Sequence, residues 1–247
     1  MLRYTDDSFF TKNPVDFVPN GGTQSNTVTL RLSAQDLGPL DGSASILIAN
    51  NVAGAMTRAG CPLLEPACVG EVFRVKTFRT EAACERWVAD YNVLRDALQP
   101  HGIVRVPGFV LPGTLTVTAR GGRVVWHAAL VQWIPGKRVS VLDERAPQAA
   151  QSPLGEVVRA LRAFRVAMRE RGISFGGLRP KHFVLPLDLA TYRGGGYYDA
   201  FQRCVVLVNW DGMTCVNGPQ AEKEQEKRYR KDFDALEEVA TIMAKYL

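Results

Sequence analysis

The hydrophobic pattern of the chain changes character near Pro135-Gly136. Before this point short apolar runs alternate with polar residues, as they do in strands, whereas after it apolar residues recur at steps of three and four, as they do on helices. This segregation predicts an α+β fold with a β-rich N-terminal lobe and a short, mainly helical C-terminal lobe. The chain has 247 residues, of which 46% are hydrophobic, so two lobes can each bury a core. We expect an N-terminal arm over residues 1–26, an N-terminal lobe over residues 27–134 and a truncated C-terminal lobe over residues 135–247.

The predicted N-terminal lobe consists of strands and one long helix. The strands are expected at residues 27–32, 45–49, 71–78, 115–118 and 124–134. Thr80 is a typical N-cap residue, so a helix is expected to begin after it and to continue to about Leu98. The apolar stripe of this helix has helical spacing and consists of Ala83, Trp87, Tyr91, Leu94 and Leu98. The arm over residues 1–26 is polar and rich in turn residues, so we expect little regular structure there.

The predicted C-terminal lobe contains two helices. Ser152-Pro153 favours the start of the first helix, and Gly172 favours its end. Two short apolar runs follow at residues 183–185 and 204–208, with a glycine-rich loop between them at residues 193–196. The last helix is expected over residues 221–247, with an apolar stripe formed by Phe233, Leu236, Ala240, Met243 and Leu247.

The net charge is only weakly positive, with 30 Lys and Arg residues against 25 Asp and Glu residues, or +5. The charges are spread along the chain, so the sequence does not indicate nucleic acid as a partner. The mixed-charge run at residues 222–231 is typical of the solvated start of a helix. The alternative is a basic binding face formed by Lys227, Arg228, Arg230 and Lys231.

The cysteine content and the hydropathy of the sequence indicate the cellular compartment in which the protein is expected. The five cysteines are odd in number and form no C-x-x-C pair, which argues against a disulfide framework or a zinc site. The first residues lack the apolar run of a signal peptide, and no apolar stretch approaches the ~20 residues needed to cross a bilayer. We therefore expect an intracellular protein, cytoplasmic or nuclear, without a membrane partner.

Three motifs then follow one another along the chain. They are Arg74-Val75-Lys76 on a predicted strand, ISFGGLRPKHFVL at residues 173–185 and VLVNWDG at residues 206–212. With the order of predicted strands and helices, they resemble the protein-kinase-like superfamily over residues 27–247. The resemblance implies that Lys76 pairs with the α- and β-phosphates of ATP and with a carboxylate on the following helix. The alternative is an ordinary solvent-facing lysine on an edge strand.

The resemblance also implies a partner for Lys76 and a hinge. Glu85 and Asp90 are the candidate partners on the predicted helix, but Glu85 points away from the apolar stripe. Asp90 lies at the edge of the stripe, where a carboxylate needs a cation or a hydrogen bond, so we choose Asp90. The strand that contains Gln132 and Trp133 is similar to the last strand before the kinase hinge, whose main chain holds adenine.

The residues that perform kinase chemistry are replaced. Phe175 stands at the position of the catalytic-loop histidine, Gly177 at that of the catalytic aspartate, His182 at that of the metal-binding asparagine and Asn209 at that of the metal-binding aspartate. Glycine cannot accept the proton of a hydroxyl, and Mg²⁺ prefers oxygen to an imidazole nitrogen. Asn209 removes one negative charge from the metal site, and Asp211 is a candidate substitute.

We therefore predict a catalytically impaired pseudokinase that acts as a protein-interaction or regulatory module, with a protein partner, no metal and no required cofactor. The first alternative is a kinase-fold enzyme that holds a nucleotide, ATP with Mg²⁺, through Lys76, Asp90, Asn209 and Asp211. Such an enzyme would perform slow or altered phosphoryl or nucleotidyl transfer. The second alternative is an unrelated α+β binding protein, in which Lys76 would lie outside any cleft between lobes. Nucleic acid is not an expected partner.

Overall fold

The computed structural model of the chain describes residues 14–21, 27–33, 46–53, 72–98, 104–119, 122–134, 136–138, 164–186, 205–215 and 222–244. The chain divides into two compact units. The first unit comprises Met1–Ala89 and Gly108–Trp133, and the second comprises Asp90–Pro107 and Ile134–Leu247. The division after Trp133 lies beside the boundary predicted from the sequence, whereas Asp90–Pro107, which the sequence placed in the N-terminal lobe, joins the second unit. Within the described residues, no helix is long and apolar enough to cross a membrane.

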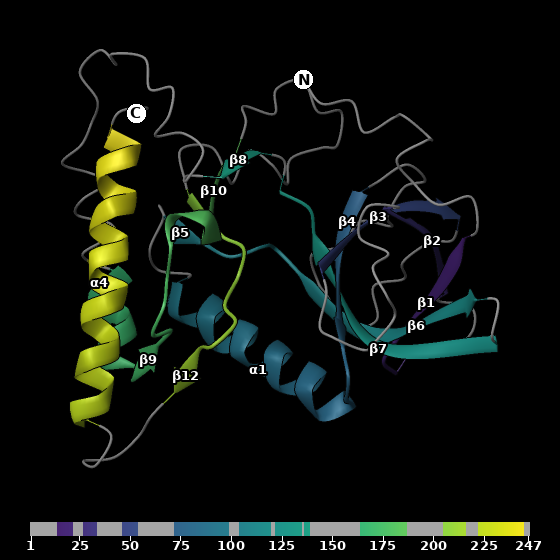
Figure 1. Ribbon diagram of the computed structural model, residues 1–247, viewed down its shortest axis with the longest axis horizontal. Coiled ribbons are helices and arrows are strands. Elements are labelled where there is room, and N and C mark those ends of the chain that lie inside the picture. The colour runs from purple at the N-terminus through teal and green to yellow at the C-terminus, as the bar shows by residue number, and fades with distance from the viewer. Residues whose placement is uncertain are drawn as a thin grey trace. The chain divides into compact units, whose positions relative to one another are not determined.

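The first unit is built on a closed antiparallel barrel (Figure 1). Its strands are β1 (Val15–Pro19), β2 (Val28–Leu32), β3 (Ile46–Ala53), β4 (Val72–Phe78), β6 (Val110–Ala119) and β7 (Gly122–Gln132). They follow one another around the barrel in the order β1-β2-β3-β4-β7-β6. Alternate side chains point inward, and the core includes Phe17, Leu30, Phe73, Leu115 and Leu130. The five strands expected between residues 27 and 134 are thereby confirmed, although β3 and β6 are longer than predicted.

Strand β1 corrects the expectation that residues 1–26 have little regular structure. It pairs with β2 on one side and with β6 on the other, and so closes the barrel. Val15 and Phe17 are buried in the core. Asp16 between them is exposed and accepts a hydrogen bond from Oγ1 of Thr29 at 3.2 Å. Part of the predicted arm is therefore a structural strand of the first unit.

Gly113 on β6 lies directly against β1. A Cβ atom there would collide with the carbonyl oxygen of Val18 and would lie 2.6 Å from Cζ of Phe17. We expect Gly113→Ala to lower the free energy of unfolding by roughly 1–3 kcal/mol, because the main chain of β1 would have to move. Urea unfolding measures the effect, with Gly177→Ala as the control, since a Cβ at Gly177 would meet no atom within 4 Å. Equal stability of the two variants would contradict the close contact between β1 and β6.

Helix α1 (Glu81–Leu98) follows β4 directly. The predicted N-cap is confirmed, because Oγ1 of Thr80 accepts the N–H of Ala83 at 3.2 Å. Most of the predicted apolar stripe is buried, namely Trp87, Tyr91, Leu94 and Leu98. Ala83 itself is exposed, and its neighbour Cys84 is buried instead. The Cys84 thiol donates to the carbonyl oxygen of Ala128 on β7 at 3.5 Å, and burial raises its pKa to about 11, so it remains a protonated donor.

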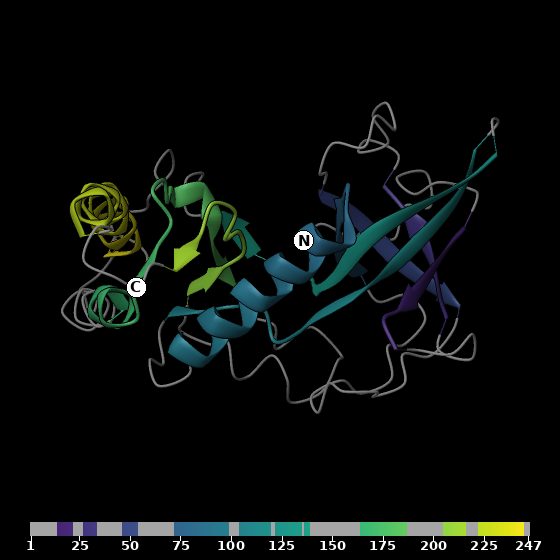
Figure 2. The same cartoon turned by 90° about the horizontal axis from the view of Figure 1, so that it is seen from below.

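The second unit contains a four-stranded sheet in the order β5-β11-β10-β8, a separate pair of strands, β9 and β12, and the long helix α4. The bounds are β5 (Val104–Arg105), β8 (Gly136–Arg138), β9 (Ile173–Ser174), β10 (Phe183–Pro186), β11 (Val205–Leu207), β12 (Thr214–Cys215) and α4 (Glu222–Ala244). A helical segment at residues 164–170 lies beside α4 (Figure 2). The guanidinium of Arg165 lies 3.8 Å from the centroid of the Phe233 ring, and Arg169 forms an ion pair with Glu226 at 3.5 Å.

These helices confirm the helical elements predicted for the C-terminal lobe where the structure describes them. The segment at residues 164–170 ends at Gly172, whose φ of +64° is a left-handed conformation that favours glycine. The predicted last helix corresponds to α4. The predicted helix start at Ser152-Pro153 and the glycine-rich loop at residues 193–196 lie outside the described residues.

Candidate functional site: a loop anchored by a buried carboxylate

Lys76 lies in the wall of the barrel and not at a sheet edge. Strand β4 pairs with both β3 and β7, so that Lys76 is opposite Ile46 on one side and Ala129 on the other. The lysine is only 6% exposed. Its Nζ lies 5.1 Å from the ring centroid of Trp87 and 5.7 Å from that of Phe78. The alternative of a solvent-facing lysine on an edge strand is therefore wrong.

The first turns of α1 supply an aromatic neighbour for Lys76. Trp87 faces the ammonium group at cation–π distance, which stabilises a buried positive charge. Asp90, the predicted partner, belongs to the second unit. Burial raises the pKa of the Cys215 thiol on β12, and the negative charge of Asp90 raises it further. The pairing of Lys76 with Asp90 stays a prediction.

Gln132, at the predicted hinge, has a structural role within the first unit. Its side chain is buried, and Oε1 accepts the N–H of Gly108 at 2.6 Å. Its own N–H donates to the carbonyl oxygen of Phe109 at 3.3 Å. These bonds connect the end of β7 to the segment that enters β6, while Trp133 is partly exposed. Adenine binding by this segment stays a prediction.

In the second unit, a single carboxylate holds the loop at residues 175–178. Asp232 of α4 is 1% exposed and accepts hydrogen bonds from consecutive main-chain N–H groups. Oδ2 accepts from Phe175 at 2.8 Å and Gly176 at 3.0 Å, and Oδ1 accepts from Gly177 at 3.0 Å and Leu178 at 3.1 Å. Successive N–H groups that converge on one anion form a nest. The nest satisfies both the buried charge and the main chain of the loop.

Glycine permits the path of this loop. Gly176 has a φ of +66°, and a Cβ atom there would lie 2.9 Å from Nε of Arg228. Gly177, which the resemblance aligned with the catalytic aspartate of kinases, presents only main-chain groups, and its N–H is already bonded to Asp232. The space where a side chain would begin at Gly177 is open, because no heavy atom lies within 4 Å of an added Cβ.

The segment after β11 is a tight turn. Oδ1 of Asn209 accepts the N–H of Asp211 at 3.1 Å, and the N–H of Met213 donates to the carbonyl oxygen of Trp210 at 3.1 Å. Gly212 completes the turn with a φ of +79°. The amide oxygen of Asn209, which the resemblance aligned with a metal-binding aspartate, is thus bonded within its own turn, and Asp211 is exposed.

The structure brings together positions of the second unit that the sequence analysis compared with kinase motifs. The N–H of Val208 donates to the carbonyl oxygen of His182 at 2.9 Å, which joins the end of β11 to the short helix η5 (Pro180–His182). A Cβ at Gly212 would lie 3.4 Å from the carbonyl oxygen of Phe175. Phe175, His182 and the Asn209 turn therefore lie in one region of the second unit.

An aromatic pair fixes this turn in the core of the second unit. Trp210 is buried, and its ring centroid lies 5.5 Å from that of Tyr91 on α1. The Tyr91 hydroxyl donates to the carbonyl oxygen of Pro107 at 2.7 Å. The segment between Asn209 and Gly212 is therefore held by buried side-chain packing as well as by its own main-chain bonds.

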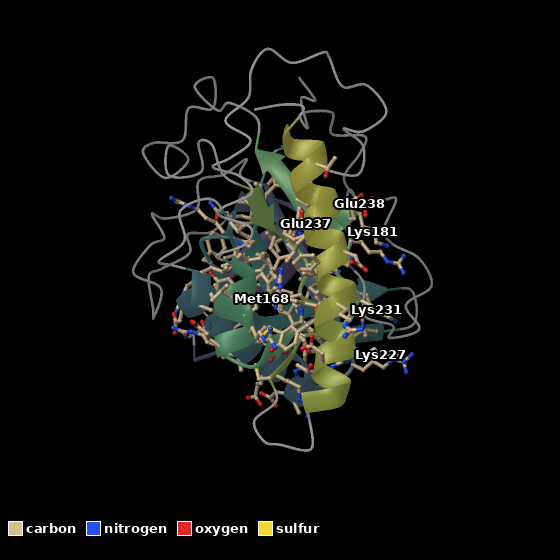
Figure 3. All side chains as sticks on the ribbon, turned by 90° about the vertical axis from the view of Figure 1, so that its left-hand side faces the viewer. Met168, Lys181, Lys227, Lys231, Glu237 and Glu238 are labelled. Carbon is tan, nitrogen blue, oxygen red and sulfur yellow. The ribbon has the colours of Figure 1, made fainter. Side chains whose placement is uncertain are left out.

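The charged start of α4 only partly fits the alternative of a basic face. Lys227 and Lys231 lie along one side of α4, together with Lys181 (Figure 3). Arg228 is turned towards β12 and donates to Oγ1 of Thr214. It is therefore not available as an exposed member of that face.

The sequence analysis missed Asp232. This residue lies four and seven positions before Leu236 and Val239, which are both buried, so it occupies the apolar face of α4. A carboxylate on an apolar face requires a partner, and the same rule had singled out Asp90. Applied to α4, the rule would have found Asp232 but not its main-chain donors.

Comparisons with known proteins concern the fold alone. No protein-family model matches the chain, and no curated protein matches it. Similar solved structures include the autoinhibited serine kinase domain of the giant muscle protein titin, with 9% identity and a TM-score of 0.40 over 74% of this chain and 46% of that one. This chain thus spans less than half the length of that structure. The PknI kinase domain of Mycobacterium tuberculosis has 16% identity and a TM-score of 0.40, over 85% of this chain and 72% of that one. The α+β class, with a curled antiparallel sheet followed by helices, is confirmed.

Proposed function

We propose that the protein is a pseudokinase, a kinase-like scaffold that binds a partner protein and does not transfer phosphoryl groups. The observation that carries this proposal is the loop at residues 175–178, whose main chain is held by Asp232 although its catalytic position is glycine. A general base must reach the substrate hydroxyl with a proton acceptor. Gly177 has no side chain, and its main-chain N–H is a donor that is already used.

The metal positions support the same proposal. Mg²⁺ requires oxygen ligands, preferably carboxylates, in a regular octahedral arrangement. Asn209 offers a neutral amide whose oxygen is bonded to the N–H of Asp211, and His182 offers an imidazole nitrogen. The base and the metal stabilise the same transition state. When both are lost, neither can compensate for the absence of the other.

The surroundings of Lys76 agree with a structural role. In a working kinase this ammonium group pairs with phosphates. Here it lies over the rings of Trp87 and Phe78, which stabilise a cation in a buried position. Because side chains of the protein itself stabilise this cation, the fold does not require a bound nucleotide.

The retained framework favours a binding role. The nest around Asp232 and the pair formed by Trp210 and Tyr91 hold the loop region of the second unit in a defined shape. A preordered surface loses less conformational entropy when it binds. A protein partner uses such a surface without any reactive group.

Restoring the lost groups tests the proposal. We expect the wild-type chain to show no thermal shift with ATP and Mg²⁺ or Mn²⁺. The variant Gly177→Asp/His182→Asn/Asn209→Asp is expected to bind Mg·ATP and to unfold at a higher temperature when ATP is present, because it regains oxygen ligands and a base. The open space around Gly177 accommodates the new aspartate.

The control combines the triple variant with Lys76→Met, which removes the cation that the kinase resemblance assigns to phosphate binding and is expected to abolish the gain. Nucleotide binding with product formation by the wild-type chain would overturn the proposal in favour of an atypical kinase-fold enzyme. Failure of the folded triple variant to bind Mg·ATP would show that these positions are not the cause of the deficit.

A further inference from the structure

We propose that a second copy of this chain pairs with the outer edge of β7 at residues 122–126. Strand β7 has 11 residues, but β4 pairs only with its last part, from His127 to Gln132. Strand β4 ends at Phe78, after which the chain enters α1. In the described parts of the chain, no strand pairs with residues 122–126 on the edge opposite β6.

The free edge belongs to a hairpin that extends beyond the neighbouring strands. Figures 1 and 2 both show the β6–β7 hairpin projecting past the end of β4. On the other side, β1 reaches only as far as Thr116 of β6. An unpaired edge presents a row of N–H and C=O groups that another strand can bond, unless a proline, a bulge or a charge protects it.

The sequence of this edge offers little protection against pairing. Residues 122–126 read GRVVW and contain no proline and no acidic residue. Arg123 is the one charge, and its Nη2 donates to Oγ1 of Thr116 at 3.5 Å, so it reaches across to β6. The arginine therefore points along the hairpin and does not cover the outer edge.

Exposed valines make both faces of the edge suitable for pairing. Val124 is 36% exposed and Val125 is 54% exposed. Because adjacent residues of a strand point to opposite faces, each face of the hairpin carries a β-branched side chain in solvent. Such side chains favour strands and gain from packing against a neighbour across the pair.

The edge is complementary to itself in one register. Antiparallel pairing centred on Val124 places Gly122 opposite Trp126, Arg123 opposite Val125 and Val124 opposite its own copy. A bulky ring then faces a glycine, and no like charges are directly opposite. Parallel pairing in register would place Arg123 opposite Arg123. The antiparallel arrangement has a two-fold axis at Val124 and closes into a dimer.

Charge substitution at the two-fold axis tests this register. We expect wild-type protein to form a concentration-dependent dimer in sedimentation velocity. Val124→Glu and Val124→Lys, each alone, are expected to weaken the dimer by roughly tenfold, because like charges then meet on the axis. A 1:1 mixture of the two variants is expected to recover association as a Glu–Lys heterodimer.

A second pair of variants tests the contact beside the axis. Val125→Glu is expected to strengthen the dimer, since each glutamate would face the partner copy's arginine, and Val125→Lys is expected to weaken it. Because both valines are exposed, all variants should fold, which circular dichroism and the unfolding temperature check.

Val166 provides the matched control. It is 53% exposed and lies in the helical segment of the second unit. Val166→Glu and Val166→Lys should leave association unchanged. The inference is overturned if the wild-type chain stays monomeric at all concentrations, if the Val166 variants weaken the dimer as much as the Val124 variants do, or if the mixture fails to recover it.

Discussion

Asp232→Ala is expected to lower the free energy of unfolding by at least about 4 kcal/mol, because it removes a buried charge acceptor and leaves the main-chain donors of the loop without partners. The carboxylate accepts the N–H groups of Phe175, Gly176, Gly177 and Leu178. Alanine keeps the helix but offers no acceptor. Urea unfolding measures the loss, and hydrogen exchange of these amides shows whether the loop has opened.

Asp234→Ala is the matched control, because Asp234 lies on the same helix two residues later and is exposed. We expect its effect to stay within about 0.5 kcal/mol. Asp232→Asn should fall between the two, since one oxygen remains as an acceptor while the amide N–H₂ meets N–H donors. Equal stability of the Asp232→Ala and Asp234→Ala variants would contradict the anchoring role.

Trp87→Ala is expected to destabilise the protein by about 3 kcal/mol, through the loss of a large buried side chain. Its ring packs on Phe78 with centroids 5.6 Å apart and faces the ammonium group of Lys76. Part of the loss should therefore depend on the charge of Lys76. Denaturant unfolding of Trp87→Ala, Lys76→Met and the double variant separates the two contributions.

In the Lys76→Met background, Trp87→Ala is expected to cost about 1 kcal/mol less, because no buried cation remains to be stabilised. Lys76→Met alone should cost little, since methionine fills the same space without a charge to bury. Strict additivity of the two substitutions would show that the ring does not stabilise the ammonium group.

Local signals in the sequence predicted much of the fold. The N-cap at Thr80 depends on one hydroxyl and the next turn of the helix, and the structure confirms it. Strands β2, β4 and β7 have apolar runs long enough to be recognised without their neighbours. The stripe of α1 was displaced only at its first member, where Cys84 replaces Ala83, because the first turn of a helix has the fewest neighbours that define its face.

Strand β1 could not be recognised in the same way. Its five residues lie between Pro14 and the turn at Asn20-Gly21, and its alternation of Val15, Asp16 and Phe17 is too short to separate from a loop. What makes it a strand is pairing with β2 and with β6, which is distant in sequence. Such pairing depends on the assembled barrel and leaves no local signal.

In the candidate site, too, some features have a local sequence signal and others depend on contacts between distant residues. The structure brings Phe175, His182 and the Asn209 turn into one region, because the strand ends and turns that carry them lie next to one another. The sequence analysis did not find Asp232, whose bonds are made to main-chain groups that every sequence carries. It also did not find the contact between Trp87 and Lys76, because an aromatic ring in an apolar stripe is indistinguishable from ordinary core.

Because Asp232 bonds to main-chain amides, the shape of the loop does not depend on the chemistry of its side chains. Every residue type except proline supplies an amide hydrogen, so the path of the chain at residues 175–178 does not depend on which functional groups project from it. The loop can therefore keep the same path with or without a reactive side chain at Gly177. A loop held in this way has the same main-chain shape whether it carries a catalytic group or serves only to bind a partner.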